Sequence, residues 1–221
     1  MRRMSTCCSR AFQSAADTHF DRKTADRDLK SYRDKGPGVT TRLLRDLIVA
    51  AGQANGALLD VGCGIGALTF ELLERGMNQA VAVDASSAHL AAAADEATRR
   101  ARTAAIRFVE SDFVDVAAAL PPARVVTLDR VVCCYPSFAP LIEQAVRHAD
   151  RCLAISYPHD VWYMHGVIGL ENGLARVRGE SFRAFVHPVE RVVRMIEREG
   201  FERAGHRRTW QWSVDVYVRA S

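Results

Sequence analysis

The sequence lacks a long apolar run, because no stretch approaches the roughly 18 residues that a membrane-spanning helix needs. The basic N-terminus MRRMSTCCSRAFQSA is not followed by the apolar stretch of a signal peptide. Internal repeats and low-complexity segments are not visible either. We therefore expect a cytoplasmic protein without a membrane span.

Charges of one sign do not gather into runs. The 30 Lys and Arg residues outnumber the 26 Asp and Glu residues by a formal charge of +4, which is spread along the chain. A nucleic-acid surface needs a concentrated basic patch. We therefore expect a small-molecule substrate rather than DNA or RNA, and a homodimer stays open.

The six cysteines do not follow a CxxC framework, and we expect reduced thiols in a chain with a full-sized core. The adjacent pairs Cys7–Cys8 and Cys133–Cys134 raise the hypothesis of a zinc or arsenic site. Neighbours on a strand point to opposite faces, so at most one of Cys133 and Cys134 would join such a site. No metal site is predicted.

The length of 221 residues and the hydrophobic content of 48% are enough for one α/β domain. Short apolar runs alternate with helical patterns, which predicts right-handed crossovers and a parallel sheet covered on both faces. We expect these strands at 57–61, 80–84, 106–110, 124–134 and 152–157. The expected helices are 40–52, one ending near 75, 86–102, 114–120 and 139–151.

The two ends of the chain depart from this alternation. Charged residues at 17–33 predict one exposed helix, which KGPG at 35–38 ends. Near the C-terminus, a helix in HPVERVVRMIEREG precedes two strand-like runs, 201–210 and 211–219, with no helix between them. Such strands pair antiparallel. We therefore predict a doubly wound, Rossmann-like, seven-stranded sheet that is mostly parallel, with an antiparallel C-terminal hairpin.

The stretch LLDVGCGIGALTFELL places Gly62, Gly64 and Gly66 behind the first strand. Such a turn lets a ligand approach the backbone closely, and it suits either a dinucleotide or S-adenosylmethionine. Asp84, about 20 residues on, is placed for ribose hydroxyls in both cases. Asp60 favours S-adenosylmethionine, because a carboxylate repels a pyrophosphate and attracts an ammonium and a sulfonium.

Four motifs in order resemble the class I S-adenosylmethionine-dependent methyltransferases over about residues 40–221: LLDVGCGIG, VAVDAS, FVESDF and VVTLDRVVCCYPS. The Tyr135–Pro136 pair is similar to one in the magnesium-protoporphyrin O-methyltransferases. Asp112 would accept from the adenine amino group and Phe113 would pack beside the ring. The predicted cofactor-binding residues are Tyr32, Asp60, Gly62, Cys63, Gly64, Gly66, Asp84, Ala85, Asp112, Phe113 and Arg130.

The acceptor site is predicted from the segments outside the strand ends. We divide the chain into a helical extension over the cofactor site, 1–39, and a methyltransferase domain, 40–221, with a lid-like insertion at about 158–186. Tyr32, Arg33 and Lys35 are expected to reach the cofactor. The predicted catalytic residues are His159, His187 and Tyr135, since an imidazole takes a proton near neutral pH.

The predicted activity is methyl transfer from S-adenosylmethionine to a small, aromatic or apolar metabolite. Three alternatives stay open. The acceptor would be a protein or nucleic acid in the first. The chain would bind the cofactor without catalysis in the second, and it would be an NAD-linked oxidoreductase in the third.

Overall fold

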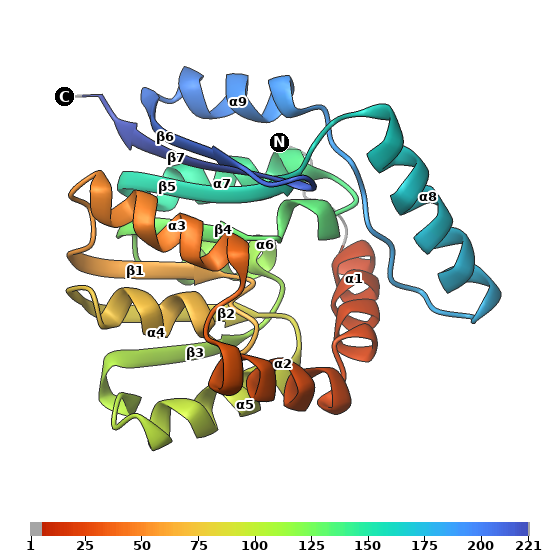
Figure 1. Ribbon diagram of the computed structural model, residues 1–221, viewed down its shortest axis with the longest axis horizontal. Helices are drawn as coiled ribbons and strands as arrows, with labels where there is room; N and C mark the ends of the chain where they lie inside the picture. The colour runs from red at the N-terminus through yellow and green to blue at the C-terminus, as the bar shows by residue number, and fades with distance from the viewer. Residues whose placement is uncertain (1–5, 221) are drawn as a thin grey trace.

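The computed structural model describes the backbone of residues 6–220 and the side chains of residues 12–220. Within them lies a seven-stranded sheet in the order β3-β2-β1-β4-β5-β7-β6 (Figure 1). β7 pairs antiparallel with β5 and β6, and the other pairs are parallel. The predicted sheet and hairpin are confirmed. The strands are β1 (Gly56–Val61), β2 (Met77–Asp84), β3 (Ile106–Glu110), β4 (Ala123–Asp129), β5 (Ala149–Pro158), β6 (Phe201–Arg208) and β7 (Trp212–Arg219).

Helices cover both faces of the sheet, as the apolar strands require. Successive residues of β1 point to opposite faces, so Leu58 lies in one buried apolar cluster and Leu59 in the other. The first cluster contains residues of α3 (Val39–Ala50), α4 (Ala67–Leu73) and α5 (Ser87–Arg99). The second contains residues of α6 (Phe113–Val116), α7 (Phe138–His148) and α9 (Val189–Arg198).

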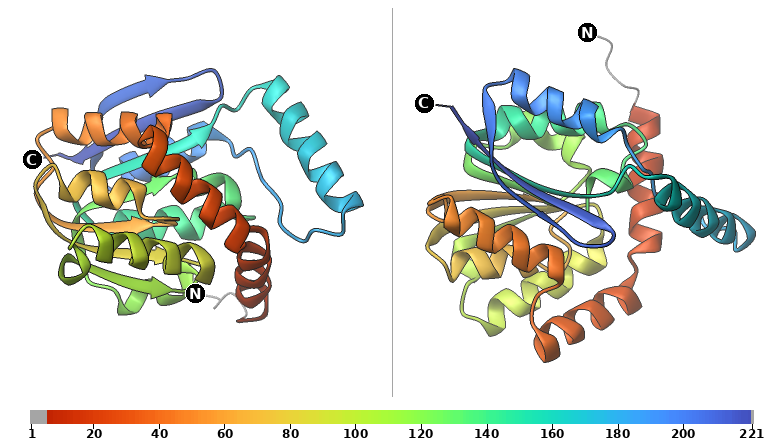
Figure 2. Two further views of the ribbon diagram at one scale, coloured as in Figure 1. Left: turned by 60° about the horizontal axis from the view of Figure 1, so that its bottom comes forward. Right: turned by 45° about the horizontal axis from the view of Figure 1, so that its top comes forward.

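The N-terminal segment forms two helices, α1 (Thr6–His19) and α2 (Arg22–Lys35), so the single helix predicted over 17–33 is wrong. The chain turns because Asp21 caps α2, its Oδ1 accepting from the Thr24 N–H at 2.9 Å. Buried Ala25 and Leu29 attach α2 to the first apolar cluster. Both helices lie beside the carboxyl ends of the parallel strands (Figure 2).

The fourth strand is shorter than predicted. β4 ends at Asp129, and Arg130 takes a left-handed backbone conformation with φ 62°. Residues Val132–Cys134 then form a 3₁₀ turn, η3. The strand predicted over 124–134 is therefore wrong beyond Asp129, and Cys133 and Cys134 do not lie on a strand.

The insertion after β5 contains a further helix, α8 (Trp162–Val177), which stands away from the sheet (Figure 2). An extended segment leads from α8 back to α9. Among the helices of residues 6–220, none is long and apolar enough to cross a membrane.

Candidate active site

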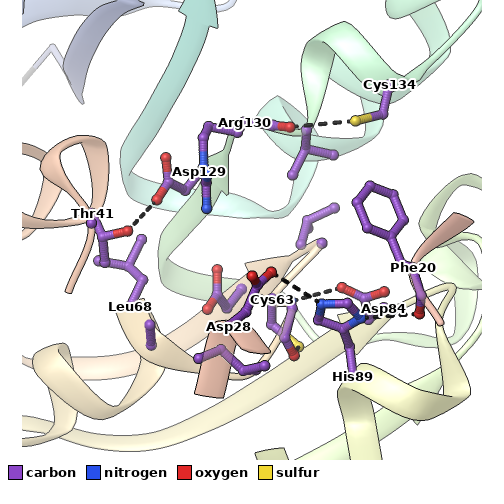
Figure 3. Close-up of a pocket in the computed structure, with 18 of the residues that line it drawn as sticks. Phe20, Asp28, Thr41, Cys63, Leu68, Asp84, His89, Asp129, Arg130 and Cys134 are labelled. Carbon is purple, nitrogen blue, oxygen red and sulfur yellow. Dashed lines mark hydrogen bonds and ion pairs between the residues drawn. The ribbon is translucent and has the colours of Figure 1, made fainter. Parts of the chain in front are cut away.

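A cavity of about 630 Å³ opens where the parallel strands end (Figure 3). It lies at the boundary between β1 and β4, where the strand order reverses. Ligands of doubly wound α/β folds bind at this position. Most of the residues predicted to bind a cofactor line the cavity: Tyr32, Asp60, Gly62, Cys63, Gly64, Asp84, Ala85, Phe113 and Arg130.

The turn after β1 requires glycine for its backbone conformation and for its packing. Gly62, Gly64 and Gly66 have φ angles of 64°, 54° and 77°, which only glycine adopts at little cost. A Cβ on Gly62 would lie 2.4 Å from Cγ2 of Val131, and one on Gly66 would lie 3.0 Å from Cε2 of Phe70. Gly66 is not among the lining residues, and its role is to shape the start of α4.

Asp84 connects this turn to the end of β2. Its Oδ2 accepts from the Gly64 N–H at 2.7 Å and its Oδ1 from the Ser86 N–H at 2.8 Å. Burial raises the pKa of Asp84. A carboxylate has about four lone-pair sites, so Asp84 retains capacity for hydroxyl groups of a ligand in the cavity.

Asp60 lies deeper, with 1% of its surface exposed. Its Oδ1 accepts from the Thr127 hydroxyl at 2.7 Å and its Oδ2 from the Thr69 hydroxyl at 2.6 Å. Burial raises the pKa of Asp60 to about 6, against the effect of these two hydrogen bonds. Asp60 thus lines the cavity with both carboxylate oxygens held by threonine hydroxyls.

The end of β4 supplies a carboxylate that the sequence reasoning missed. Asp129 accepts from the Thr41 hydroxyl and from the Ser156 hydroxyl, each at 2.6 Å, and lines the cavity. Ser156 Oγ also accepts from the Arg130 N–H at 2.8 Å. An acidic residue at the end of a buried strand was the signal available, since strand ends meet at one edge of a parallel sheet.

Asp112 and Tyr135 are paired with each other. The Tyr135 hydroxyl donates to Asp112 Oδ1, which also accepts from the Val114 N–H at 3.0 Å. Asp112 thus caps α6 and is not among the lining residues, whereas Ser111, Phe113 and Tyr135 are. Burial raises the pKa of Tyr135. Tyr135 therefore forms part of the cavity wall. Its hydroxyl is a poor base, because it stays protonated and donates its hydrogen to Asp112.

The N-terminal residues divide between the cavity and the core. Tyr32 is a lining residue, and its hydroxyl donates to Glu71 Oε1 at 3.2 Å. Lys35 is a lining residue. Arg33 instead binds Glu96 Oε2 at 2.8 Å, which connects α2 to α5, so the expectation that Arg33 reaches the cofactor is wrong.

Aromatic side chains from distant segments meet over the cavity. Phe12 of α1 packs on Tyr135 with ring centroids 4.5 Å apart. Phe20, between α1 and α2, packs on Phe182 at 5.2 Å. All four line the cavity, and Phe182 comes from the insertion after β5. No short-range pattern in the sequence reveals such a cluster.

A buried histidine under Asp84 was also missed. His89 of α5 has Nδ1 at 3.2 Å from both the Phe20 carbonyl oxygen and Ser86 Oγ, and Nε2 at 3.7 Å from Asp28 of α2. Its pKa is raised by Asp28 and Asp84, against the effect of burial. His89 and Asp28 line the cavity (Figure 3) and join the N-terminal helices to the domain.

The two histidines predicted as bases lie elsewhere. His159 is buried, with Nε2 donating to the Thr209 carbonyl at 2.9 Å and Nδ1 at 3.0 Å from Ser213 Oγ. His187 donates from Nε2 to the Tyr135 carbonyl at 2.9 Å, and burial lowers its pKa. Neither is a lining residue of the cavity. The structure thus does not place His159 or His187 where they could act on an acceptor.

Residues 58–155 match the family model described as a methyltransferase domain. A comparison with curated protein sequences finds no match.

Several solved structures are similar to the chain. Magnesium protoporphyrin IX methyltransferase from Synechocystis PCC 6803 with bound S-adenosylhomocysteine is 22% identical, with a TM-score of 0.71 over 94% of this chain and 100% of that one. An O-methyltransferase family protein from Burkholderia thailandensis is 17% identical, with a TM-score of 0.73 over 96% of this chain and 64% of that one. A putative RNA methyltransferase from Pyrococcus horikoshii is 12% identical, with a TM-score of 0.60 over 85% and 86%.

The match of residues 58–155 to a methyltransferase domain and the fold together support the prediction that the chain is a class I methyltransferase enzyme. Solved structures with this fold contain bound S-adenosylmethionine or S-adenosylhomocysteine, so the predicted cofactor is confirmed. Of the predicted activity, methyl transfer from this cofactor is confirmed. The alternatives of an NAD-linked oxidoreductase and of a binder without catalysis are set aside.

Proposed function

We propose that this enzyme transfers the methyl group of S-adenosylmethionine to a small, aromatic or apolar metabolite bound in the same cavity. One observation carries the proposal. The cavity is lined by the glycine turn and Asp84 and also by an aromatic wall. The wall consists of Phe12, Phe20, Tyr135 and Phe182.

The lining residues suit the parts of the cofactor. Asp84 and the turn at Gly62–Gly64 would hold the ribose, and the charge of Asp60 favours the ammonium end. Phe113 would pack beside the adenine. The position of Arg130 supports a contact near the transferred methyl group. Asp112, by contrast, would act by fixing Tyr135 and the start of α6 rather than by binding adenine itself.

The N-terminal helices would cover the bound cofactor. Tyr32, Lys35, Asp28 and Phe20 line the cavity from this segment. Phe20 also contacts Phe182, so the segment 1–39 and the insertion at 158–186 would close over the acceptor together. Such a cover excludes water from the methyl transfer.

Methyl transfer from S-adenosylmethionine does not require a dedicated catalytic side chain. Methyl transfer is an in-line displacement at a positively charged sulfur, so alignment of the acceptor supplies most of the rate. Tyr135 serves as wall, because its hydroxyl donates to Asp112 and its pKa is raised. An acceptor whose reacting atom is already deprotonated needs no further base.

A labelled-transfer experiment tests the acceptor class. The enzyme is incubated with S-adenosylmethionine labelled in the methyl group and a cell extract, and small metabolites, protein and RNA are then separated. We expect enzyme-dependent label among apolar metabolites. Label that accumulates only in protein or RNA would contradict the proposal, because those acceptors would have to reach the sulfur past the aromatic wall.

A further inference from the structure

Two neighbouring thiols lie beside the cavity at the end of β4. Residues Val132–Cys134 form a 3₁₀ turn, so the side chains of Cys133 and Cys134 do not point to opposite faces as on a strand. Their Sγ atoms are 4.0 Å apart. Each thiol also lies 3.4 Å from the carbonyl oxygen of Arg130 and donates to it. Cys134 lines the cavity (Figure 3).

We propose that Cys133 and Cys134 form a vicinal dithiol that a hydroperoxide oxidises to a disulfide. One thiolate attacks the peroxide, whose O–O bond breaks, giving a sulfenic acid and releasing hydroxide or alkoxide. The second sulfur then displaces the sulfenic oxygen as water, and the S–S bond forms. Two electrons pass from the sulfurs to the peroxide, and both thiol protons end in the released products.

The surroundings of the pair favour this reaction. The neighbouring Cys134 thiol and the charge of Arg130 lower the pKa of Cys133 against the effect of burial. The thiolate is the nucleophile. Cys134 gives a small peroxide access from the cavity. The Cys63 thiol, which also lines the cavity, donates instead to the Gly64 carbonyl oxygen at 3.6 Å.

The turn that carries the pair is positioned to transmit the change. Arg130 holds a left-handed backbone with φ 62°, which is costly for a residue with a side chain. Both thiols donate to its carbonyl oxygen, and a disulfide has no S–H group to donate. The next residue, Val131, fills the space beside Gly62, where a Cβ would lie 2.4 Å away. Oxidation should therefore move Val131 against the glycine turn.

Peptide mass spectrometry tests the disulfide directly. Trypsin cleaves after Arg130 and Arg147, and the peptide 131–147 contains Cys133 and Cys134 and no other cysteine. The folded enzyme is treated with hydrogen peroxide, alkylated without reduction and digested. We expect this peptide to lose two hydrogens and to resist alkylation. A peptide that stays fully alkylated, or that gains only oxygen, would overturn the proposal.

Binding of S-adenosylhomocysteine measures the consequence, and this part rests on the proposed function. We expect oxidised enzyme to bind about tenfold more weakly, or about 1.4 kcal/mol, and dithiothreitol to restore binding. Cys133→Ser cannot form the disulfide, so its affinity should not show this reversible loss. A disulfide that leaves affinity unchanged would overturn the coupling to Gly62. Reduced enzyme that fails to bind at all would instead contradict the proposed function.

Discussion

The main-chain N–H of Gly64 donates a hydrogen bond to Oδ2 of Asp84 at 2.7 Å. The same carboxylate accepts the Ser86 N–H through Oδ1 and faces the cavity. Asp84 thus builds the glycine turn and presents acceptor capacity to a ligand. Loss of the carboxylate should damage both.

Asp84→Ala should weaken S-adenosylhomocysteine binding about a hundredfold, which is about 2.8 kcal/mol. The reason is that the variant loses the ribose acceptor and the hydrogen bond that fixes Gly64. Isothermal titration calorimetry measures the change. Asp95→Asn is the control. Asp95 lies exposed on α5, and its replacement removes one negative charge, as Asp84→Ala does. An Asp84→Ala affinity equal to that of Asp95→Asn would contradict this role.

Asp60 should make cofactor binding depend on pH. Burial raises its pKa to about 6, so the carboxyl is protonated below that pH and loses its attraction for an ammonium. We expect affinity for S-adenosylhomocysteine to fall about fivefold between pH 6 and pH 5. Methylthioadenosine, which lacks the ammonium, should show a flat profile over this range. Equal profiles for both ligands would show that Asp60 does not act through charge.

The Asp60 carboxyl should also make the stability of the fold depend on pH, and here protonation is favourable rather than unfavourable. Since its folded pKa lies above the unfolded value of about 3.9, the folded state binds the proton more tightly. Its contribution to stability is therefore largest at low pH and declines as pH rises from about 4 to about 6. Asn does not titrate, so the melting temperature of Asp60→Asn should rise relative to that of the parent as the pH increases from about 4 to about 6.

The ion pair between Arg33 and Glu96 should hold the N-terminal helices in place. The Glu96 carboxylate is fully buried under Arg99, Arg100 and Arg33, which lower its pKa to about 2. Arg33→Ala should expose residues 12–35 to protease and weaken S-adenosylhomocysteine binding a few-fold. Arg99→Ala removes a guanidinium from the same carboxylate within α5, so it should not. If Arg33→Ala and Arg99→Ala changed proteolysis and binding equally, Arg33 would contribute only to overall stability and would not hold the N-terminal helices in place.

His159 should matter for folding rather than for methyl transfer. His159→Ala leaves the Thr209 carbonyl and the Ser213 hydroxyl without this partner, which should cost about 1–3 kcal/mol in the free energy of unfolding. Urea denaturation measures this loss. The rate per folded enzyme should keep the pH profile of the parent once an acceptor is known. Loss of the acidic limb of that profile would restore His159 as a base.

The sheet was predictable because its signals are local. Apolar runs such as 57–61 and 80–84 alternate with helical periodicity, and two strands without a helix between them pair antiparallel. The cavity residues on the glycine turn and at Asp84 were predictable for the same reason, since strand ends meet at one edge.

The errors came from features without a local signal. The left-handed Arg130 ends β4 early, and this placed the two cysteine thiols together rather than on opposite faces. The hydrogen-bond partners of His159 lie about 50 residues away in the β6–β7 hairpin, so its burial could not be inferred from its neighbours. Phe12, Phe20 and Phe182 meet only in the fold.

A crystal structure of the enzyme with S-adenosylhomocysteine, from a soak that also contains NAD, tests the central claim most directly. We predict that the ribose hydroxyls lie within hydrogen-bond distance of the Asp84 carboxylate, with the sulfur facing the aromatic wall of Phe12, Phe20, Tyr135 and Phe182. A dinucleotide lodged at Gly62–Gly64, or a nucleoside sulfur turned away from that wall, would contradict the account.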